Sequence, residues 1–493
     1  MISIDCPEQN MPQNHRESNS PAVAQLLQFR HELKNSFRHR PDAIMNLLDA
    51  LSSNTDAISV AQLSLNPCFR YQYPSVYDGI DNFFTGCNFD NAAAERQEKD
   101  RQLVQLIQRY LPQPKQRDFW LFCLDVTPAP RPFAQTLADR TCVYQPNLIP
   151  SNKPVTIGHQ YAALVHLPEK ESLSTPPWVV PLSIRRIQSQ EKATTVQAQQ
   201  ITSLLAEQPF ASRLCVTVVD STLSALTFLG EVKDNPYLVT IARCRSSRVF
   251  YHTPKLAEKK RGHPTWYGQR FDLKDQTTWP PPDSVQQVNL TTRRGRQFTV
   301  EIQGWQNLLM RGTREYPMHQ SPFTLIRIVV NNASGKPVFS RPLWLIIIGN
   351  RRAEISLKQI WVAYRQRYDV EHFFRFGKQR LLTTAYQTPE VEHEENWWQM
   401  TRLAYVQLWL ARELAQGLPR PWERYLPQFE TGACASPSMV QRDFRRIIST
   451  IEPNSVLPKP RGKSPGRAKG TGQNRRERQN VIKKTPKRLK SAA

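Results

Sequence analysis

Four side chains suited to work on a phosphodiester lie within one short stretch of this sequence. They are Tyr364, Arg367, Glu371 and Lys378, separated by 3, 4 and 7 residues. At about 100° per residue, all four fall within an arc of about 60° on a helix. A carboxylate between two cations and a phenol suggests a metal-bound carboxylate acting on a phosphate backbone. The alternative is a solvated helix face, on which Arg367 and Glu371 form an ordinary i,i+4 ion pair.

Two aspartates each end an apolar run that is predicted to be a buried strand. They are Asp125 and Asp220. Strands that are apolar throughout are covered on both faces, as in α/β sheets, and sites lie beyond the carboxyl ends of such strands. Together with Glu371, these carboxylates can hold two Mg²⁺ ions about 3.5–4 Å apart. Each aspartate has a structural alternative as a turn or helix cap, since Asp220 precedes a Ser-Thr pair and a predicted helix.

This ordered set resembles the catalytic motifs of the DDE transposases. The resembling stretches are Asp125-Val-Thr, Val218-Val-Asp220-Ser-Thr and the series from Tyr364 to Lys378. The last has 2, 3 and 6 intervening residues, which is the Y-(2)-R-(3)-E-(6)-K element of a bacterial insertion-sequence branch. Further stretches resemble a cyanobacterial-type subgroup: Gly158-His-Gln-Tyr161, Arg243-Cys-Arg245 and Pro460-Arg-Gly-Lys-Ser-Pro-Gly466. The resemblance covers roughly residues 20–490 and implies an RNase H-like catalytic core.

The resemblance also implies a role for each residue. The metal ligands would be Asp125, Asp220 and Glu371, binding Mg²⁺ with Mn²⁺ as a substitute. Arg367 and Lys378 would donate charge-assisted hydrogen bonds to backbone phosphates, with Tyr364 nearby. The substrate would be double-stranded DNA, both transposon ends and target, held by a homodimer on paired ends. Water attack would free a 3′-hydroxyl that then attacks the target or the opposite strand.

Members of this branch can stack an aromatic residue from the β-rich insertion on a flipped base. Trp266, Trp279 and Trp305 lie in the corresponding region, and we single out Trp305 because it adjoins a glycine. For each of them the alternative is a buried core tryptophan. Arg243 and Arg245 are expected to line the DNA path, with a solvated position as the alternative.

The charge balance points to a polyanionic partner. The 493 residues include 66 Lys and Arg against 42 Asp and Glu, a net charge of +24. Residues 457–493 hold 13 of these cations and one acid, yet the remaining body is also basic. Nucleic acid is the simplest partner for such a chain. An anionic membrane surface is disfavoured because there is no basic amphipathic anchor.

Cysteine usage and the first residues bear on location. None of the eight cysteines forms a CxxC pair or has zinc-site spacing with histidine, and several lie in apolar runs. The N-terminus is polar and lacks an apolar signal region. The longest strongly apolar run, residues 343–348, is far too short to span a bilayer. We therefore expect a reduced, cytoplasmic, nucleoid-associated protein with no membrane partner.

The chain is predicted to be an α/β protein with an RNase H-like core, a mixed sheet flanked by helices, interrupted by a β-rich insertion. Long helices are expected at residues 356–382 and 394–416. The expected domains are a disordered N-terminus (1–20), a helical DNA-binding domain (21–115), the first part of the core (116–243), the insertion (244–340), the second part of the core (341–420), a C-terminal helical segment (421–456) and a disordered basic tail (457–493).

These features predict a DDE transposase that catalyses metal-dependent DNA cleavage and strand transfer. One rival is a domesticated, non-cleaving DNA-binding or architectural protein, against which the complete set of three acids argues. The other rival is an endonuclease with the same core and no strand transfer.

Overall fold

The structure, a computed structural model, describes most of the chain. The described residues are 21–84, 92–145, 154–170, 172, 175–207, 209–254, 266–292, 295–417, 434–452, 468–472 and 475–483. The predicted disorder of residues 1–20 lies outside this set.

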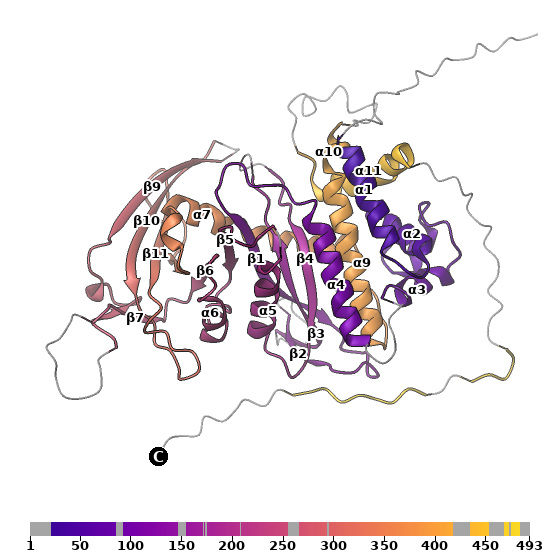
Figure 1. Cartoon of the computed structure of the whole chain (residues 1–493), viewed down its shortest axis with the longest axis horizontal. Coiled ribbons are helices and arrows are strands. Elements are labelled where there is room, and N and C mark those ends of the chain that lie inside the picture. Colours follow the sequence, from indigo (N-terminus) through magenta and orange to yellow (C-terminus); the bar gives the residue numbers. More distant parts are fainter. Residues whose placement is uncertain are drawn as a thin grey trace, which may run out of the picture.

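One mixed sheet of ten strands runs through the middle of the molecule (Figure 1). Its order is β2-β3-β1-β5-β6-β12-β11-β10-β9, with β4 also paired to β3. The strands are β1 (Trp120–Pro130), β2 (Thr141–Tyr144), β3 (Val155–His166), β4 (Val180–Ile187), β5 (Cys215–Val219), β6 (Leu238–Cys244), β9 (Ser284–Thr291), β10 (Gln297–Leu308), β11 (Phe323–Asn332) and β12 (Leu343–Ile348). A separate two-stranded sheet pairs β7 (Val249–Tyr251) with β8 (Arg270–Asp272).

The catalytic-core part of the sheet has the predicted character. Strands β4, β3 and β1 are antiparallel, whereas β1, β5 and β6 run parallel to one another. The apolar runs of β1 and β5 are buried because helices cover both faces of the sheet. This mixed sheet flanked by helices is compatible with the RNase H-like core that the family resemblance implies.

The predicted insertion continues the core sheet. Strand β12 pairs with β6 on one side and with β11 on the other, so β11, β10 and β9 extend the same hydrogen-bonded ladder. The described part of residues 244–340 is rich in strands, as expected. The register across β6 and β12 joins the insertion firmly to the site-bearing strands.

The helices surround this sheet. They are α1 (Pro21–Asn35), α2 (Pro41–Ser52), α3 (Pro74–Asp81), α4 (Ala92–Gln108), α5 (Ala193–Leu205), α6 (Leu226–Val232), α7 (Leu357–Gln366), α8 (Tyr368–Arg380), α9 (Val391–Leu410), α10 (Arg412–Gly417) and α11 (Pro437–Ile451). Three short 3₁₀ turns are η1 (Ala61–Leu65), η3 (Gln276–Thr278) and η4 (Arg352–Glu354). In the part of the chain that the structure describes, every helix is too short or too polar to cross a bilayer.

The N-terminal helices share the hydrophobic core of the rest of the molecule. A buried polar network fixes this contact: the Arg30 guanidinium donates to both Asp49 carboxylate oxygens, at 2.5 and 3.0 Å, and to Gln407 Oε1 on α9 at 2.6 Å. Because the charges are paired and buried, separating α1 and α2 from α9 would be costly. Helices α1 and α2 are therefore packed onto the core, and the role of residues 21–115 in DNA binding stays a prediction.

The expected continuous helix at 356–382 is divided in two, which corrects the sequence-based prediction. Helix α7 ends at Gln366 and α8 begins at Tyr368, with Arg367 at the junction. The Arg367 N–H donates to Tyr364 O and the Val370 N–H to Arg367 O, both i→i−3 bonds that tighten the turn. Similarly, the second predicted helix consists of α9 and α10.

Candidate active site

The first two acids lie side by side where the parallel pairing of β1 and β5 ends. Asp220 follows the last residue of β5, whereas β1 continues past Asp125 to Pro130, so the strand end predicted at Asp125 is wrong. In the β1–β5 pairing Leu124 is opposite Val219, so Asp125 and Asp220 are the next residues on neighbouring strands. Neighbouring strands are about 4.8 Å apart. Strand register alone therefore brings these two carboxylates together.

Arg367 joins the third acid to this pair. Its Nη2 donates to Glu371 Oε1 at 2.6 Å, and its Nη1 donates to Asp125 Oδ2 at 3.4 Å. The Arg367 side chain is 10% exposed, whereas that of Glu371 is 40% exposed. The i,i+4 ion pair between Arg367 and Glu371 that was the alternative from the sequence is thus present. Arg367 also bonds Asp125 on the sheet, so this helix face is not simply solvated.

The surroundings of Asp125 disfavour the charged form of its carboxyl group. Burial raises the pKa of Asp125 to about 6, and the carboxylates of Asp220 and Glu371 add to this effect. Arg367 and the Val126 N–H act in the opposite direction. Burial also disfavours the charge of Arg367, but Tyr364 and the acids outweigh it and raise the pKa of this guanidinium. A buried carboxylate with an elevated pKa next to other acids is a typical feature of a functional site.

Asp220 has the turn role that was one of the two structural alternatives from the sequence. Its Oδ1 accepts from the N–H groups of Thr222 and Leu223, at 2.9 and 3.4 Å, and its Oδ2 accepts from the Thr222 hydroxyl at 3.1 Å. These bonds fix the turn after β5. Helix α6 begins later, at Leu226, so Asp220 orients a loop at the sheet edge and is not the helix cap.

The next strand adds cations to the same edge. Ala242 on β6 is opposite Val219 on β5, which places Arg243 beside Asp220. Arg243, on β6, and Arg245, just beyond the end of β6, are both exposed. The ring of Tyr364 is buried, and burial raises its pKa to about 12 against the opposing effects of Arg367 and Arg243. Arg243 and Tyr364 therefore lie near the acids, and the predicted role of these residues in binding DNA stays a prediction.

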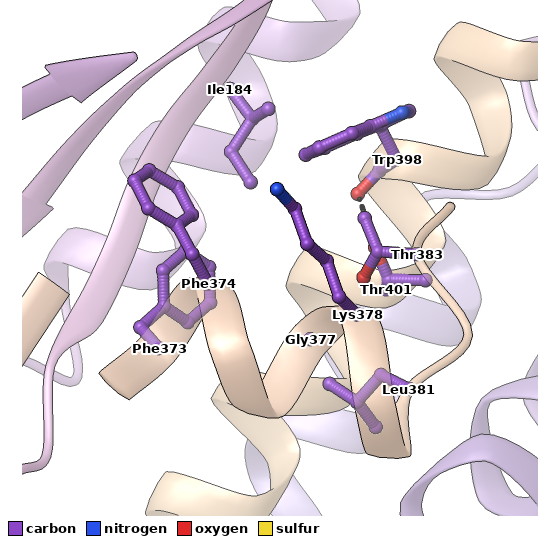
Figure 2. A pocket seen from close by; sticks show the side chains of 9 residues that line it. All are labelled: Ile184, Phe373, Phe374, Gly377, Lys378, Leu381, Thr383, Trp398 and Thr401. Atoms are coloured by element: carbon purple, nitrogen blue, oxygen red, sulfur yellow. Dashed lines mark hydrogen bonds between the residues drawn. The ribbon is translucent and has the colours of Figure 1, made fainter. Parts of the chain in front are cut away.

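Lys378 lies farther along the same face of α8, in an apolar pocket (Figure 2). The side chain extends between Phe374 and Trp398 toward Ile184 of β4. The cavity measures about 10 Å³, which is too small for more than one water. Among the described residues no carboxylate pairs with this ammonium group, and burial lowers the pKa of Lys378 to about 8.

Sheet register relates this pocket to the acids. Asp125 is opposite Ala163 on β3, and Ala163 is opposite Ile184 on β4. Side chains at paired positions share one face of a sheet, so Ile184 lies on the Asp125 face two strands away, about 10 Å across. Helix α8 therefore begins beside the acids, next to Arg367, and reaches this pocket at Lys378.

The choice of Trp305 as a base-stacking residue does not fit its position. Its ring is 3% exposed, its Nε1 donates to Pro280 O at 2.9 Å, and it packs against Phe271, Trp279 and Trp344. Its buried surroundings are those of the core alternative. Trp266 is 45% exposed and stacks on His319 with ring centroids 4.3 Å apart.

Two positioning features escaped the sequence analysis. Lys170, in the loop after β3, pairs with Asp369 of α8, with Nζ 2.7 Å from Oδ2. This contact anchors the first turn of α8, and no local signal links residues 199 positions apart. Strand β4, which supplies Ile184, was also missed, although its run Val180–Ile187 is largely apolar.

The donor set suits a hard divalent cation, with one obstacle. Asp125, Asp220 and Glu371 offer carboxylate oxygens, which are the ligands that Mg²⁺ prefers. Within the described residues, however, no three His, Cys, Asp or Glu side chains are close enough together to hold a metal. The reason is that Arg367 occupies the space between Asp125 and Glu371. A metal would bind all three acids only after this guanidinium moved.

A comparison with protein families agrees with this arrangement. A family model described as DDE superfamily endonuclease matches residues 28–311, more than half of the chain. The chain belongs to this family, whose members cleave DNA with divalent metal ions, typically Mg²⁺. The matched segment includes Asp125 and Asp220 and ends before Glu371. No curated protein shows a significant match to the chain.

Proposed function

We propose that this protein is an insertion-sequence transposase that cleaves DNA and transfers the freed strand to a target. The observation that carries the proposal is the meeting of Asp125 and Asp220 by strand register, with Glu371 joined to them through Arg367. The family supports DNA cleavage, and the spacing from Tyr364 to Lys378 supports the transposase branch.

In this proposal Asp125, Asp220 and Glu371 are the metal ligands. Two Mg²⁺ ions bound there would activate a water or 3′-hydroxyl and stabilise the leaving oxygen of the phosphodiester. The protein's part is to hold the carboxylates in place. The turn bonds of Asp220 orient one of them, and the Lys170–Asp369 pair fixes the helix that carries Glu371.

The cations have a second role in substrate binding. Arg367 can donate to two oxygens at once, as it does to Asp125 and Glu371. When a cation neutralises those acids, the same guanidinium is free to donate to a backbone phosphate. Arg243 and Arg245 extend the positive surface at the carboxyl end of β6. We infer that Lys378 leaves its apolar pocket to bind phosphate.

For stacking on a base we now favour Trp266 over Trp305. An exposed aromatic ring in the insertion can reach a base, whereas a core ring at 3% exposure cannot. Trp266→Ala should weaken DNA binding with little change in the midpoint of thermal unfolding. Trp305→Ala should lower the unfolding free energy by about 3–5 kcal/mol, as expected for a buried aromatic.

The proposal is tested with Mg²⁺ and a labelled duplex that carries the DNA ends flanking the gene. Wild-type protein should cleave at the ends and join them to a target plasmid. Glu371→Gln should retain binding and lose cleavage, while the matched control Glu392→Gln, an exposed acid on α9, should cleave normally. Undiminished cleavage by Asp125→Asn would contradict the assignment.

The same assay separates the two rivals. A domesticated architectural protein would bind the duplex and never cleave it, with or without Mg²⁺. An endonuclease without strand transfer would cleave the duplex and produce no joined plasmid. Two copies holding paired ends, which we also propose, should appear as a protein–DNA complex containing two duplexes of different length.

A further inference from the structure

Part of the basic C-terminal tail is seated on the edge of the main sheet. Residues 475–483 run in extended form past β2, as the yellow segment near that strand in Figure 1. The Gln479 N–H donates to Gln135 O and the Ile482 N–H donates to Arg140 O, both at 2.8 Å. Ile482 also forms a parallel bridge with Thr141 at the start of β2. The sequence predicted an unstructured tail, and this stretch is an exception within it.

The surface that the tail contacts includes a buried arginine, Arg140, whose guanidinium donates a hydrogen bond to the tail. Arg140 is 3% exposed and donates to Leu137 O at 3.1 Å and to Arg131 O at 3.3 Å. Its remaining group, Nη2, donates to Gln479 O at 3.1 Å. A buried guanidinium with an unmade hydrogen bond is costly, so this contact favours the seated tail. A further ion pair joins Arg476 to Glu390 just before α9.

Strand geometry explains why this edge accepts a peptide. β2 is the terminal strand of the sheet order, and edge strands expose unpaired N–H and C=O groups. An extended segment that pairs with such an edge uses backbone hydrogen bonds for affinity and side chains for selectivity. Both bonds from Gln479 and Ile482 are backbone bonds, but their acceptors Gln135 and Arg140 precede β2, so only the Thr141–Ile482 bridge involves the strand itself.

The docked segment adds exposed cations at the β2 edge of the sheet. Arg475, Arg478 and Lys483 are exposed along it. Thr141 pairs with Gly158, which is opposite Pro130, five residues beyond Asp125 on β1. This offset is about 17 Å along the strand, the rise of about five base pairs.

An exposed aromatic ring accompanies these cations. Phe133, on the same loop as Gln135, is 91% exposed. Cations interleaved with exposed aromatic rings are typical of nucleic-acid surfaces, since the rings stack on bases while the cations bind phosphates.

We propose that residues 475–483 form a strap that docks on β2 and holds the basic tail against duplex DNA leaving the active site. The partner is the phosphate backbone, bound without sequence preference. The proposal rests on the proposed function only for the nature of the partner. Docking itself rests on the contacts of the strap with Gln135, Arg140 and Thr141.

The test removes docking and keeps every charge. The double variant Gln479→Pro/Ile482→Pro lacks both strap N–H donors. The matched control is Asn480→Pro, because the Asn480 N–H donates to no described residue. Binding to a labelled duplex of unrelated sequence is measured by anisotropy over a range of salt concentrations, without Mg²⁺.

The double variant should bind about tenfold more weakly, and the slope of log K against log salt should fall by about 2–3, as expected for three lost phosphate contacts. Asn480→Pro should match the wild type. An unchanged affinity and slope in the double variant would overturn the strap, and the tail would then act as a free arm.

A second measurement tests docking without DNA. Trypsin cleavage after Arg475 and Arg476 should be slow in the wild type and in Asn480→Pro, and several-fold faster in the double variant. Equal rates in all three proteins would overturn docking. Neither strap measurement depends on cleavage. A failure of Mg²⁺-dependent cleavage would therefore count against the proposed function alone, and the test of the strap would still hold.

Discussion

At the N-terminal end of α8, Arg367 and Glu371 lie among charges, with Asp125 and Asp220 on the two neighbouring strands β1 and β5 or directly after them. At the other end of the same helix face, Lys378 lies among apolar side chains with no ion pair among the described residues. Arg367 thus has two carboxylate partners, whereas Lys378 has none among the described residues. The two cations of this helix face therefore have different surroundings: Arg367 pairs with acids, and Lys378 lies in an apolar pocket.

Of the replacements of these two cations, that of Arg367 should change the rate of cleavage most. Arg367→Ala removes the guanidinium that compensates Asp125 and Glu371, so cleavage should fall by about 10²–10³-fold. The unfolding free energy should fall by about 1–3 kcal/mol, because charged hydrogen bonds are lost. Single-turnover cleavage and urea unfolding measure the two effects. The control is Arg375→Ala, which removes an exposed arginine of α8. An equal loss of cleavage in both variants would contradict a specific role of Arg367 beside the acids.

Replacing Lys378 should have an opposite effect on stability. Lys378→Met puts an apolar side chain among Ile184, Phe374 and Trp398, and should raise the unfolding free energy at pH 7 by about 1–3 kcal/mol. Cleavage should nevertheless decrease, since the phosphate-binding ammonium group is gone. Lys358→Met, an exposed lysine on α7, should change neither quantity.

The pH dependence gives the sign of this effect. The folded pKa of Lys378, about 8, lies below the ordinary value of 10.5, so the unfolded chain binds more protons between these pH values. Wild-type stability should therefore rise from pH 8 to about 10, and Lys378→Met should lose this rise. Urea unfolding curves at pH 7, 8.5 and 10 would show it. A wild-type stability that fell over this interval would place Lys378 in an ion pair instead.

The smallest expected effect concerns Asp125. Its folded pKa of about 6 is above the ordinary 3.8, so the folded state binds more protons between these values and stability should fall as pH rises through them. Asp125→Asn should remove this fall and stabilise the fold at pH 7.5 by about 1–2 kcal/mol. The two proteins should be nearly equal at pH 4. Added Mg²⁺ should stabilise the wild type alone, and a matching gain in the variant would contradict a ligand role.

The sequence predicted those parts of the site that depend on local pattern. Apolar runs that end on Asp125 and Asp220 specify buried strands, and the parallel register then brings the acids together. The placement of Arg367 and Glu371 followed from helical spacing, although the tight turn at Arg367 did not. Family resemblance, and not spacing, supplied their roles.

Long-range packing accounts for what the sequence did not reveal. The burial of Trp305 depends on Phe271, Trp279 and Trp344, which come from separate elements. The seat of the tail depends on Arg140, which is 339 residues from Gln479. No local periodicity encodes either contact, because both arise only when distant segments fold together.

The most direct test of the central claim is a change of metal preference at Asp220. In Asp220→Cys, a thiolate replaces an oxygen ligand, and thiolate suits Mn²⁺ better than the harder Mg²⁺. Cleavage of the end-bearing duplex should be lost with Mg²⁺ and partly restored with Mn²⁺, whereas Asp220→Ala should be inactive with both. Full activity of Asp220→Cys with Mg²⁺ would contradict the assignment of these acids as the metal site.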